Sequence, residues 1–342
     1  MKAVRIYRQG GPEVLQYEDV PDPEPGPDEV LIRLRAAALN HLDIWTRRGR
    51  PGQNIKFPLI IGSDGAGEVV QTGSRVRGVA VHEAVLVSPG LSCGHCEYCL
   101  SGRDNLCRSY NVLGTARDGT YAEYVVLPWQ NVVPMPANLD FVSGASIPLV
   151  FTTAWHMLVG LAQVQPGQEV LVWGASSGVG SAAIQIAKLH GAVVYTTASS
   201  EAKAEKARAL GADVVIDYTK EDVLARVREL TGGRGVDIVF DHVGEATWNT
   251  SIRALTRGGR LVSCGSTTGT GGSIDIRYLF SNQIQILGSY MGSKAELLRV
   301  LELVSAGKLR PVVHDVYPLA EASRAHATME AGNFFGKLTL AI

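Results

Sequence analysis

The stretch LVWGASSGVGSAAIQIAKLHGA, residues 171–192, decides the fold of this 342-residue chain. It begins with an apolar run, continues through Gly174, Gly178 and Gly180, and ends in a helix-forming segment. Glycines between a strand and a helix permit a sharp turn and let backbone N–H groups approach a phosphate. A second apolar run at 192–197 closes a βαβ unit, which favours dinucleotide binding over a plain tight turn.

The same alternation of strand and helix extends to about residue 290. Six short apolar runs occur in order, and helical segments separate the first five. The runs lie at 170–173, 193–197, 214–216, 237–240, 260–264 and 284–287, and the helices at 179–189, 201–210, 222–230 and 247–255. This pattern predicts an α/β domain with a doubly wound parallel sheet. Residues 1 to about 127 instead carry short β-like runs broken by Gly and Pro, which predicts a β-rich, partly barrel-like domain.

The end of the strand at 193–197 should determine the choice of coenzyme. An acidic side chain there would bind the ribose 2′-hydroxyl of NAD, but this chain has Ser199 and Ser200. Lys203 lies one turn into the next helix, where it could meet a 2′-phosphate. These residues favour NADP(H) over NAD(H), unless Ser200 only caps the helix and Lys203 is a solvated surface charge. The predicted coenzyme loop consists of Gly174, Ser176, Ser177, Gly178, Val179 and Gly180.

A cluster of cysteines is the sharpest metal-binding signal. Cys93, Cys96, Cys99 and Cys107 lie within fifteen residues, beside Gly94 and Gly102. Four thiolates can close a tetrahedral site around one structural zinc, which leaves no position for a substrate. The spacing does not fit the ferredoxin patterns of iron–sulfur clusters, and the remaining alternative is a set of free thiols. The fifth cysteine, Cys264, is expected to be a small buried hydrophobic residue.

Composition and charge exclude several classes of protein. The chain has 32 Lys and Arg against 33 Asp and Glu. It therefore lacks the excess positive charge that attracts nucleic acid or an anionic membrane. Residues 141–168 carry no Asp, Glu, Lys or Arg, but their polar residues predict a buried helix rather than a membrane span. The N-terminus does not resemble a secretory signal, and the odd number of cysteines suits a reducing, cytoplasmic environment.

Taken together, these features resemble the medium-chain dehydrogenase/reductase superfamily over essentially the whole chain. The resemblance implies a GroES-like catalytic domain at 1–127, with a zinc lobe at about 90–110, that is completed by 291–342. It implies a Rossmann domain at 128–290. The loop GGRLVSCGSTTG at 258–269 is similar to the nicotinamide side of the family's coenzyme site. Further coenzyme contacts implied by the resemblance are Gly265, Ser266, Thr153 and His41, the last of which could equally be a surface residue.

The catalytic metal of the zinc-dependent members has no counterpart here. Asn40, Ser63 and Leu149 stand where those members carry their ligands, and these three side chains do not make a zinc site. The segments containing Asn40, Asp43 and Asp64 are instead similar to the Asn-x-x-Asp and Gly-Ser-Asp motifs of zinc-independent quinone and enone reductases. NADP-binding members of that branch carry a Lys and a Tyr in positions similar to Lys203 and Tyr218.

The leading hypothesis is hydride transfer from NADPH to a quinone or an α,β-unsaturated carbonyl without catalytic zinc. A conjugated acceptor can delocalise the incoming charge where no Lewis acid polarises a carbonyl. Asn40 would face nicotinamide or substrate, Asp43 and Asp64 would support the pocket, and Trp45 would form a wall. Turn chemistry for Asn40 and core packing for Trp45 are the alternatives.

Two other functions are kept as alternatives. The first is a zinc-type alcohol dehydrogenase with an atypical metal site built from His41, Asp43 or Asp64. The second is an NADPH-binding protein without catalysis. In the enzyme hypotheses the partner is a small-molecule substrate, with no nucleic acid or membrane. The resemblance implies a homodimer or homotetramer, for which the apolar strand at 283–290 is a plausible pairing edge.

Overall fold

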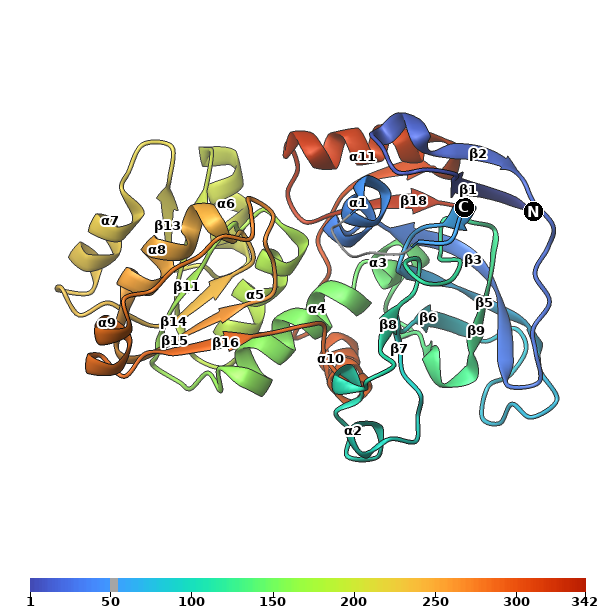
Figure 1. Ribbon diagram of the computed structural model, residues 1–342, viewed down its shortest axis with the longest axis horizontal. Helices are drawn as coiled ribbons and strands as arrows, with labels where there is room; N and C mark the ends of the chain where they lie inside the picture. The colour runs from blue at the N-terminus through green and yellow to red at the C-terminus, as the bar shows by residue number, and fades with distance from the viewer. Residues whose placement is uncertain (50–54) are drawn as a thin grey trace. The chain divides into compact units, whose positions relative to one another are not determined.

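The chain divides into two compact units. The computed structural model describes residues 1–49 and 55–342 (Figure 1). The first unit comprises Met1–Val150 and Ser293–Ile342, and the second comprises Phe151–Gly292. Residues 128–150, expected in the Rossmann domain, belong to the first unit because β10 (Val132–Pro134) pairs with β6 (Ala84–Val87).

The second unit contains one six-stranded parallel sheet with the order β13-β12-β11-β14-β15-β16 (Figure 1). Its strands are β11 (Glu169–Val172), β12 (Val193–Ala198), β13 (Val214–Asp217), β14 (Val236–Asp241), β15 (Leu255–Ser263) and β16 (Gln285–Gly288). The helices between them are α5 (Gly178–Leu189), α6 (Glu201–Ala209), α7 (Val223–Leu230) and α8 (Glu245–Ala254). The predicted doubly wound sheet is confirmed, because each amphipathic helix follows a buried strand at the expected place.

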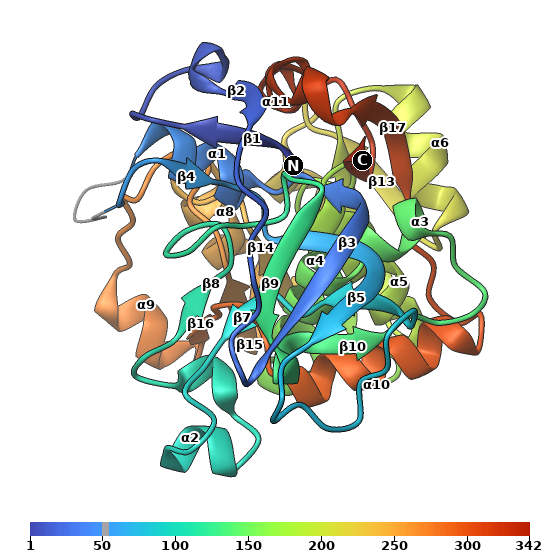
Figure 2. The ribbon, with the colours of Figure 1, turned by 90° about the vertical axis from the view of Figure 1, so that its right-hand side faces the viewer.

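The first unit contains a β-sheet with the order β10-β6-β5-β3-β18-β17, to which β9 adds by pairing with β3 (Figure 2). These strands include β3 (Glu29–Ala38), β5 (Asp64–Thr72), β9 (Tyr124–Pro128), β17 (Val313–Pro318) and β18 (Lys337–Ala341). A second sheet has the order β2 (Gln16–Asp19), β1 (Lys2–Ile6) and β4 (Leu59–Ile60). The predicted β-rich domain is confirmed. The pairing of Thr339 with Ala38 brings the end of the chain beside the residues that lead into Asn40.

The first unit also contains several helices. They include α1 (His41–Arg48), α3 (Phe141–Ala145), α10 (Lys294–Ser305) and α11 (Ala322–Ala331). The uncharged stretch 141–168 forms α3, then α4 (Pro148–Trp155), then a π-helical segment, His156–Leu161. Within the described ranges, no helix has both the length and the apolar character that crossing a bilayer would require.

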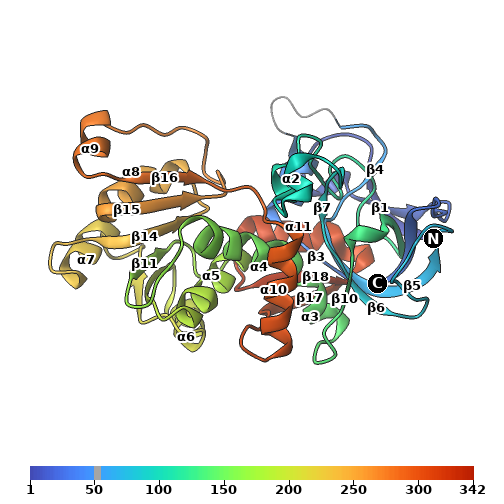
Figure 3. The same ribbon diagram turned by 90° about the horizontal axis from the view of Figure 1, so that it is seen from below.

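Two details of the second unit differ from the prediction. Strand β15 begins at Leu255 rather than at residue 260, because Leu255 already pairs with Val236 across an irregularity in the register. The connection before β16 includes a short helix that the sequence did not predict, α9 (Ile276–Ser281), near the sheet edge (Figure 3). One and a half turns of helix are too short to show a clear periodicity in the sequence.

Candidate functional site

A buried polar network surrounds the junction between β3 and α1. Asn40 is the N-cap of α1 and is 4% exposed, while Asp43 and Asp64 are 2% and 0% exposed. The Asn40 backbone N–H donates to Asp43 Oδ2 at 2.8 Å, which closes the first turn of the helix. The Asn40 side-chain amide donates to Asp64 Oδ2 at 2.9 Å. The structure thus brings together three of the four residues that were predicted to be catalytic.

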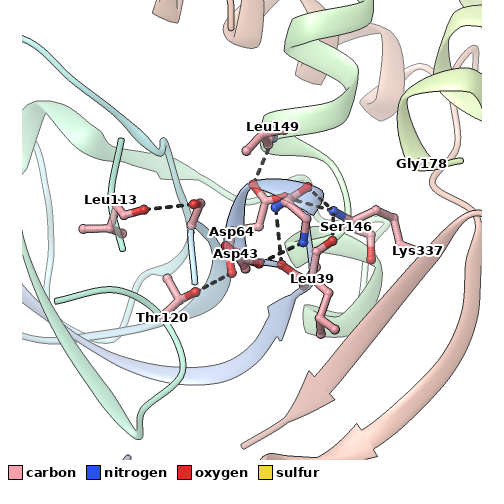
Figure 4. A network of polar contacts seen from close by, with 12 residues as sticks. Leu39, Asp43, Asp64, Leu113, Thr120, Ser146, Leu149, Gly178 and Lys337 are labelled. Atoms are coloured by element: carbon pink, nitrogen blue, oxygen red, sulfur yellow. Dashed lines mark hydrogen bonds and ion pairs between the residues drawn. The ribbon is translucent and has the colours of Figure 1, made fainter. Parts of the chain in front are cut away.

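The ammonium group of Lys337 lies at the centre of this network (Figure 4). Its Nζ donates to the Leu39 carbonyl at 2.7 Å, to Asn40 Oδ1 at 2.6 Å and to Asp64 Oδ2 at 3.3 Å. An ammonium group has three donors, so all three are used. Lys337 is only 3% exposed, as expected for a buried lysine that is paired.

Asp64 is held from the opposite side by the start of α4. The backbone N–H of Leu149, in the first turn of that helix, donates to Asp64 Oδ1 at 2.9 Å. Helix N-termini stabilise carboxylates through such free N–H groups. The neighbouring Ser63 points elsewhere, because its hydroxyl donates to the Leu113 carbonyl at 2.9 Å.

From Asp43 the hydrogen-bond network extends to Tyr121 and His326, on the side away from Lys337. The phenol of Tyr121 donates to Asp43 Oδ2 at 3.0 Å and lies 3.2 Å from His326 Nε2. Both Tyr121 and His326 are fully buried, and their rings meet edge to face at 5.8 Å. Tyr121 therefore links α1 to α11 through the interior of the first unit.

Burial dominates the electrostatics of these groups. It raises the pKa of Asp43 to about 7, against the opposing effects of the Asn40 N–H and Lys337. It also raises the pKa of Asp64, which Lys337 and the Asn40 amide partly offset. The pKa of Lys337 is lowered by the same desolvation, while Asp64 and Asp43 act in the opposite direction. One cation and two carboxyl groups thus share a site that water does not reach.

The donor set does not fit the catalytic zinc of the zinc-dependent branch. The Lys337 ammonium already donates to the side-chain oxygen of Asn40 and to one oxygen of Asp64. The Ser63 hydroxyl donates to the Leu113 carbonyl. Leu149 offers only a backbone N–H, which cannot bind a cation. In the described part of the chain, His41, Asp43 and Asp64 do not form a group of three close ligand atoms either. A zinc ion would have to displace Lys337 to bind here.

Trp45, the fourth residue predicted to be catalytic, lies one turn along α1. It is half-buried and packs beside His41, with the two ring centroids 6.2 Å apart. Its predicted role as a pocket wall stays a prediction.

The glycine loop has the geometry of a phosphate cradle. Ser177 is the N-cap of α5, and its Oγ accepts from the Gly180 N–H at 2.8 Å. Gly174 has φ +62°, and a Cβ at Gly180 would lie 2.3 Å from the Gly174 carbonyl oxygen. Both positions therefore require glycine. The loop places Gly178 and Gly180 in the first turn of a twelve-residue helix, where they allow a close approach of the pyrophosphate.

The other residues predicted to bind coenzyme follow the carboxyl ends of neighbouring strands, except Thr153 and His41. Ser199 and Ser200 follow β12, Tyr218 follows β13, and Gly265 and Ser266 follow β15. Parallel strands place these ends at one edge of the sheet. Ser200 caps α6 through the Lys203 N–H at 3.4 Å, and Tyr218 is 52% exposed. Thr153 lies on α4, where its buried hydroxyl has no hydrogen-bond partner among residues 1–49 and 55–342.

The four predicted zinc ligands converge. The sulfur atoms of Cys93, Cys96, Cys99 and Cys107 all lie within 4.8 Å of one another, and none forms a disulfide. Hydrogen bonds from backbone N–H groups, led by that of His95, lower the pKa of Cys93 to about 6. The set and its spacing fit a tetrahedral structural zinc.

Lys337, Tyr121 and His326 complete this buried network and were not predicted from the sequence. Lys337 lies in the apolar run FFGKLTLAI, between Phe335 and Leu338. A charge in such a run is rarely buried without a partner, so this pattern was the available signal. Tyr121 and His326 carry no comparable signal, because single aromatic residues in a β-strand or helix are usually core residues.

Comparison with known proteins agrees with both units. The alcohol dehydrogenase GroES-like domain model matches residues 26–137, and the zinc-binding dehydrogenase model matches residues 178–306. An NAD-dependent alcohol dehydrogenase of Sulfolobus acidocaldarius is 35% identical, with 100% of each chain covered. A quinone oxidoreductase of Pseudomonas aeruginosa is 33% identical, with 99% of each chain covered.

A solved structure described as an NAD-dependent alcohol dehydrogenase is 50% identical and superposes with a TM-score of 0.96 over 100% of each chain. The relatives thus span both alcohol and quinone chemistry on one two-domain fold. The chain belongs to the medium-chain dehydrogenase/reductase superfamily and is an NAD(P)-dependent oxidoreductase of that type.

Proposed function

We propose that this enzyme transfers hydride from NADPH to a quinone or an α,β-unsaturated carbonyl, without a catalytic metal. The observation that carries the proposal is the Lys337 ammonium, which uses the oxygen atoms of Asn40 and Asp64 that a metal would need. The structural zinc in the cysteine cluster is separate from this chemistry, because its four positions are filled by protein ligands.

The network positions residues rather than acting on the acceptor directly. The Asn40 side-chain amide donates to Asp64, and its oxygen accepts from Lys337. These two hydrogen bonds fix the Asn40 rotamer before substrate binds. Asp43 fixes the backbone N–H of the same residue. Bound NADPH supplies the hydride. A conjugated acceptor spreads the incoming charge over several atoms, so its reduction depends less on a Lewis acid than that of a simple ketone.

The end of β12 supports NADP(H) as the coenzyme. Ser199 and Ser200 directly follow this strand, in the positions where NAD-binding folds place an acid. Lys203 follows on α6, and an ammonium group is a suitable partner for a 2′-phosphate. The names of several relatives specify NAD instead, so kcat/KM for NADPH and NADH must be compared directly.

The names of these relatives favour alcohol oxidation as a second candidate function. Zinc-type alcohol oxidation requires a metal at His41, Asp43 or Asp64, whereas Asp43 Oδ2 and both Asp64 oxygens already accept hydrogen bonds. Zinc-dependent alcohol oxidation is therefore the outcome that would replace the present proposal.

We also propose that the enzyme assembles as a homodimer or homotetramer through strand β16. This strand lies at one end of the sheet order, and among the described residues no strand pairs with its outer side. Ile276, Phe280, Ile286 and Tyr290 are exposed on or near this edge. An edge strand with neighbouring apolar side chains is a suitable surface for a second copy of the sheet.

A matched pair of acceptors tests the proposed reaction. Purified protein should oxidise NADPH with benzoquinone or cyclohexenone, and kcat/KM for cyclohexenone should exceed that for saturated cyclohexanone at least about tenfold. The rates should survive dialysis against a mild chelator, and NADPH should give a higher kcat/KM than NADH. Absolute dependence on added zinc, or activity confined to alcohols and saturated ketones, would contradict the reaction. A preference for NADH would contradict only the choice of coenzyme.

A further inference from the structure

The imidazole of His242 lies beneath the glycine loop. His242 directly follows β14, the neighbour of β11 in the sheet. Its Nε2 lies 2.9 Å from the Trp173 carbonyl oxygen and 3.0 Å from Ser177 Oγ. A carbonyl oxygen can only accept, so Nε2 carries the proton. Burial lowers the pKa of His242, which is consistent with a neutral ring that carries its one proton on Nε2.

Ser177 connects this donor to the start of α5. The Ser177 hydroxyl donates to the Gly174 carbonyl at 3.0 Å and accepts from the Gly180 N–H at 2.8 Å. His242 therefore joins the chain of hydrogen bonds that sets the N-cap and first turn of α5. The free N–H groups of that turn are the ones that a pyrophosphate would meet.

The fit between ring and loop is also steric. A Cβ at Gly174 would lie 3.1 Å from both Cε1 and Nε2 of His242, which is closer than most side-chain contacts allow. The imidazole thus packs directly against the sharp turn after β11. A smaller side chain would leave the turn unsupported from below.

The backbone of His242 borders the second predicted coenzyme loop. Its carbonyl oxygen accepts from the Thr267 hydroxyl at 3.2 Å, and a Cβ at Gly265 would lie 2.4 Å from it. The preceding Asp241 anchors the segment, because its Oδ2 accepts from Ser251 Oγ at 2.6 Å. Ser251 in turn accepts from the indole N–H of Trp173 at 2.8 Å. His242 thus contacts both loops that were predicted to hold the coenzyme.

We propose that His242 is a positioning residue for coenzyme binding. Its Nε2–H holds Trp173 and Ser177 so that the loop from Gly174 to Gly180 presents its N–H groups to the pyrophosphate. This inference rests on dinucleotide binding at this edge of the sheet. It concerns the affinity for the pyrophosphate rather than hydride transfer itself.

The test compares His242→Phe, which keeps a ring but removes the donor, with His242→Gln, which keeps an N–H near the position of Nε2. We expect His242→Phe to weaken NADPH or NADH binding at least about tenfold and His242→Gln to stay within about threefold of the wild type. Binding of adenosine 2′-monophosphate or adenosine, which lack the pyrophosphate, should be unchanged in both. His190→Phe is the matched control, because His190 caps the opposite end of α5.

Fluorescence titration gives the affinities, and amide hydrogen exchange of the Gly180 N–H reports the loop without ligand. Exchange should be faster in His242→Phe and unchanged in His190→Phe. If His242→Phe does not fold, Ser177→Ala should show the same selective loss. Wild-type affinity in His242→Phe, equal loss in His242→Gln, or equal loss for the fragments would overturn the inference. A wild-type protein that binds no dinucleotide would overturn the proposed function, and exchange at Gly180 would then decide the role of His242.

Discussion

Replacing Lys337 with methionine should lower the free energy of unfolding by about 3–5 kcal/mol at neutral pH, the usual cost of removing one partner from a buried ion pair. Methionine keeps an unbranched side chain of similar volume but removes all three donors. The Leu39 carbonyl and Asn40 Oδ1 would lose a hydrogen bond, and Asp64 would lose its counter-charge. Denaturant unfolding followed by tryptophan fluorescence measures the difference.

Two further variants make this result specific. Lys2→Met removes an exposed ammonium in the same unit that is 2.7 Å from Asp19, and should lower the free energy of unfolding much less than Lys337→Met does. Adding Asp64→Asn to Lys337→Met removes the uncompensated carboxylate, so a large part of the lost stability should return. A stable Lys337→Met variant, or no recovery in the double variant, would show that the buried pair does not hold this site.

Replacing Asp43 with asparagine should change how stability depends on pH. The pKa of Asp43 is about 7 in the folded chain, against an ordinary value of 3.8. A carboxyl group with a raised folded pKa contributes stability that is fully present below the ordinary pKa and is lost as the pH rises through the folded pKa. The difference between the two values corresponds to about 4 kcal/mol, lost between about pH 4 and pH 8.

Asparagine cannot ionise, but its oxygen can still accept from the Asn40 N–H and the Tyr121 hydroxyl. Asp43→Asn should therefore gain stability relative to the wild type as the pH rises, by up to about 4 kcal/mol. The groups that face Asp43 are Tyr121, Lys337 and Asp64, all of which remain in the variant. Asp222→Asn, at the exposed N-cap of α7, is the control for the change of side chain. A difference between Asp43→Asn and wild type that does not vary with pH would contradict the raised pKa.

The parts of the fold that were predictable are those with local sequence signals. A doubly wound sheet is predicted by the glycine loop at Gly174–Gly180 and by the alternation of strands β11 to β16 with helices. These elements can be recognised locally because apolar residues recur at the period of a strand or of a helix. The cysteine spacing brings four sulfur atoms together within one short lobe, so it needs no information about distant residues. The short helix α9 was missed because it has too few residues to show a period.

The centre of the candidate site was not predictable in the same way. Asn40 and Lys337 are 297 residues apart, and their contact depends on β18 pairing with the end of β3. Tyr121 and His326 are 205 residues apart and meet only because α11 packs into the first unit. Substitutions at the family's metal positions indicated that a ligand set was missing, but nothing local identified the lysine that replaces it.

Zinc content per chain tests the central claim most directly: the cysteine cluster holds the metal, and Lys337 occupies the place of a catalytic one. Elemental analysis against amino-acid quantitation, on protein purified without added metal, should give one zinc per chain. Asp64→Asn should also give one, and Cys107→Ser should give none, because it removes one of the four thiolates. Two zinc ions per chain in the wild type, or one retained in Cys107→Ser and lost in Asp64→Asn, would contradict the account and favour metal-dependent alcohol oxidation.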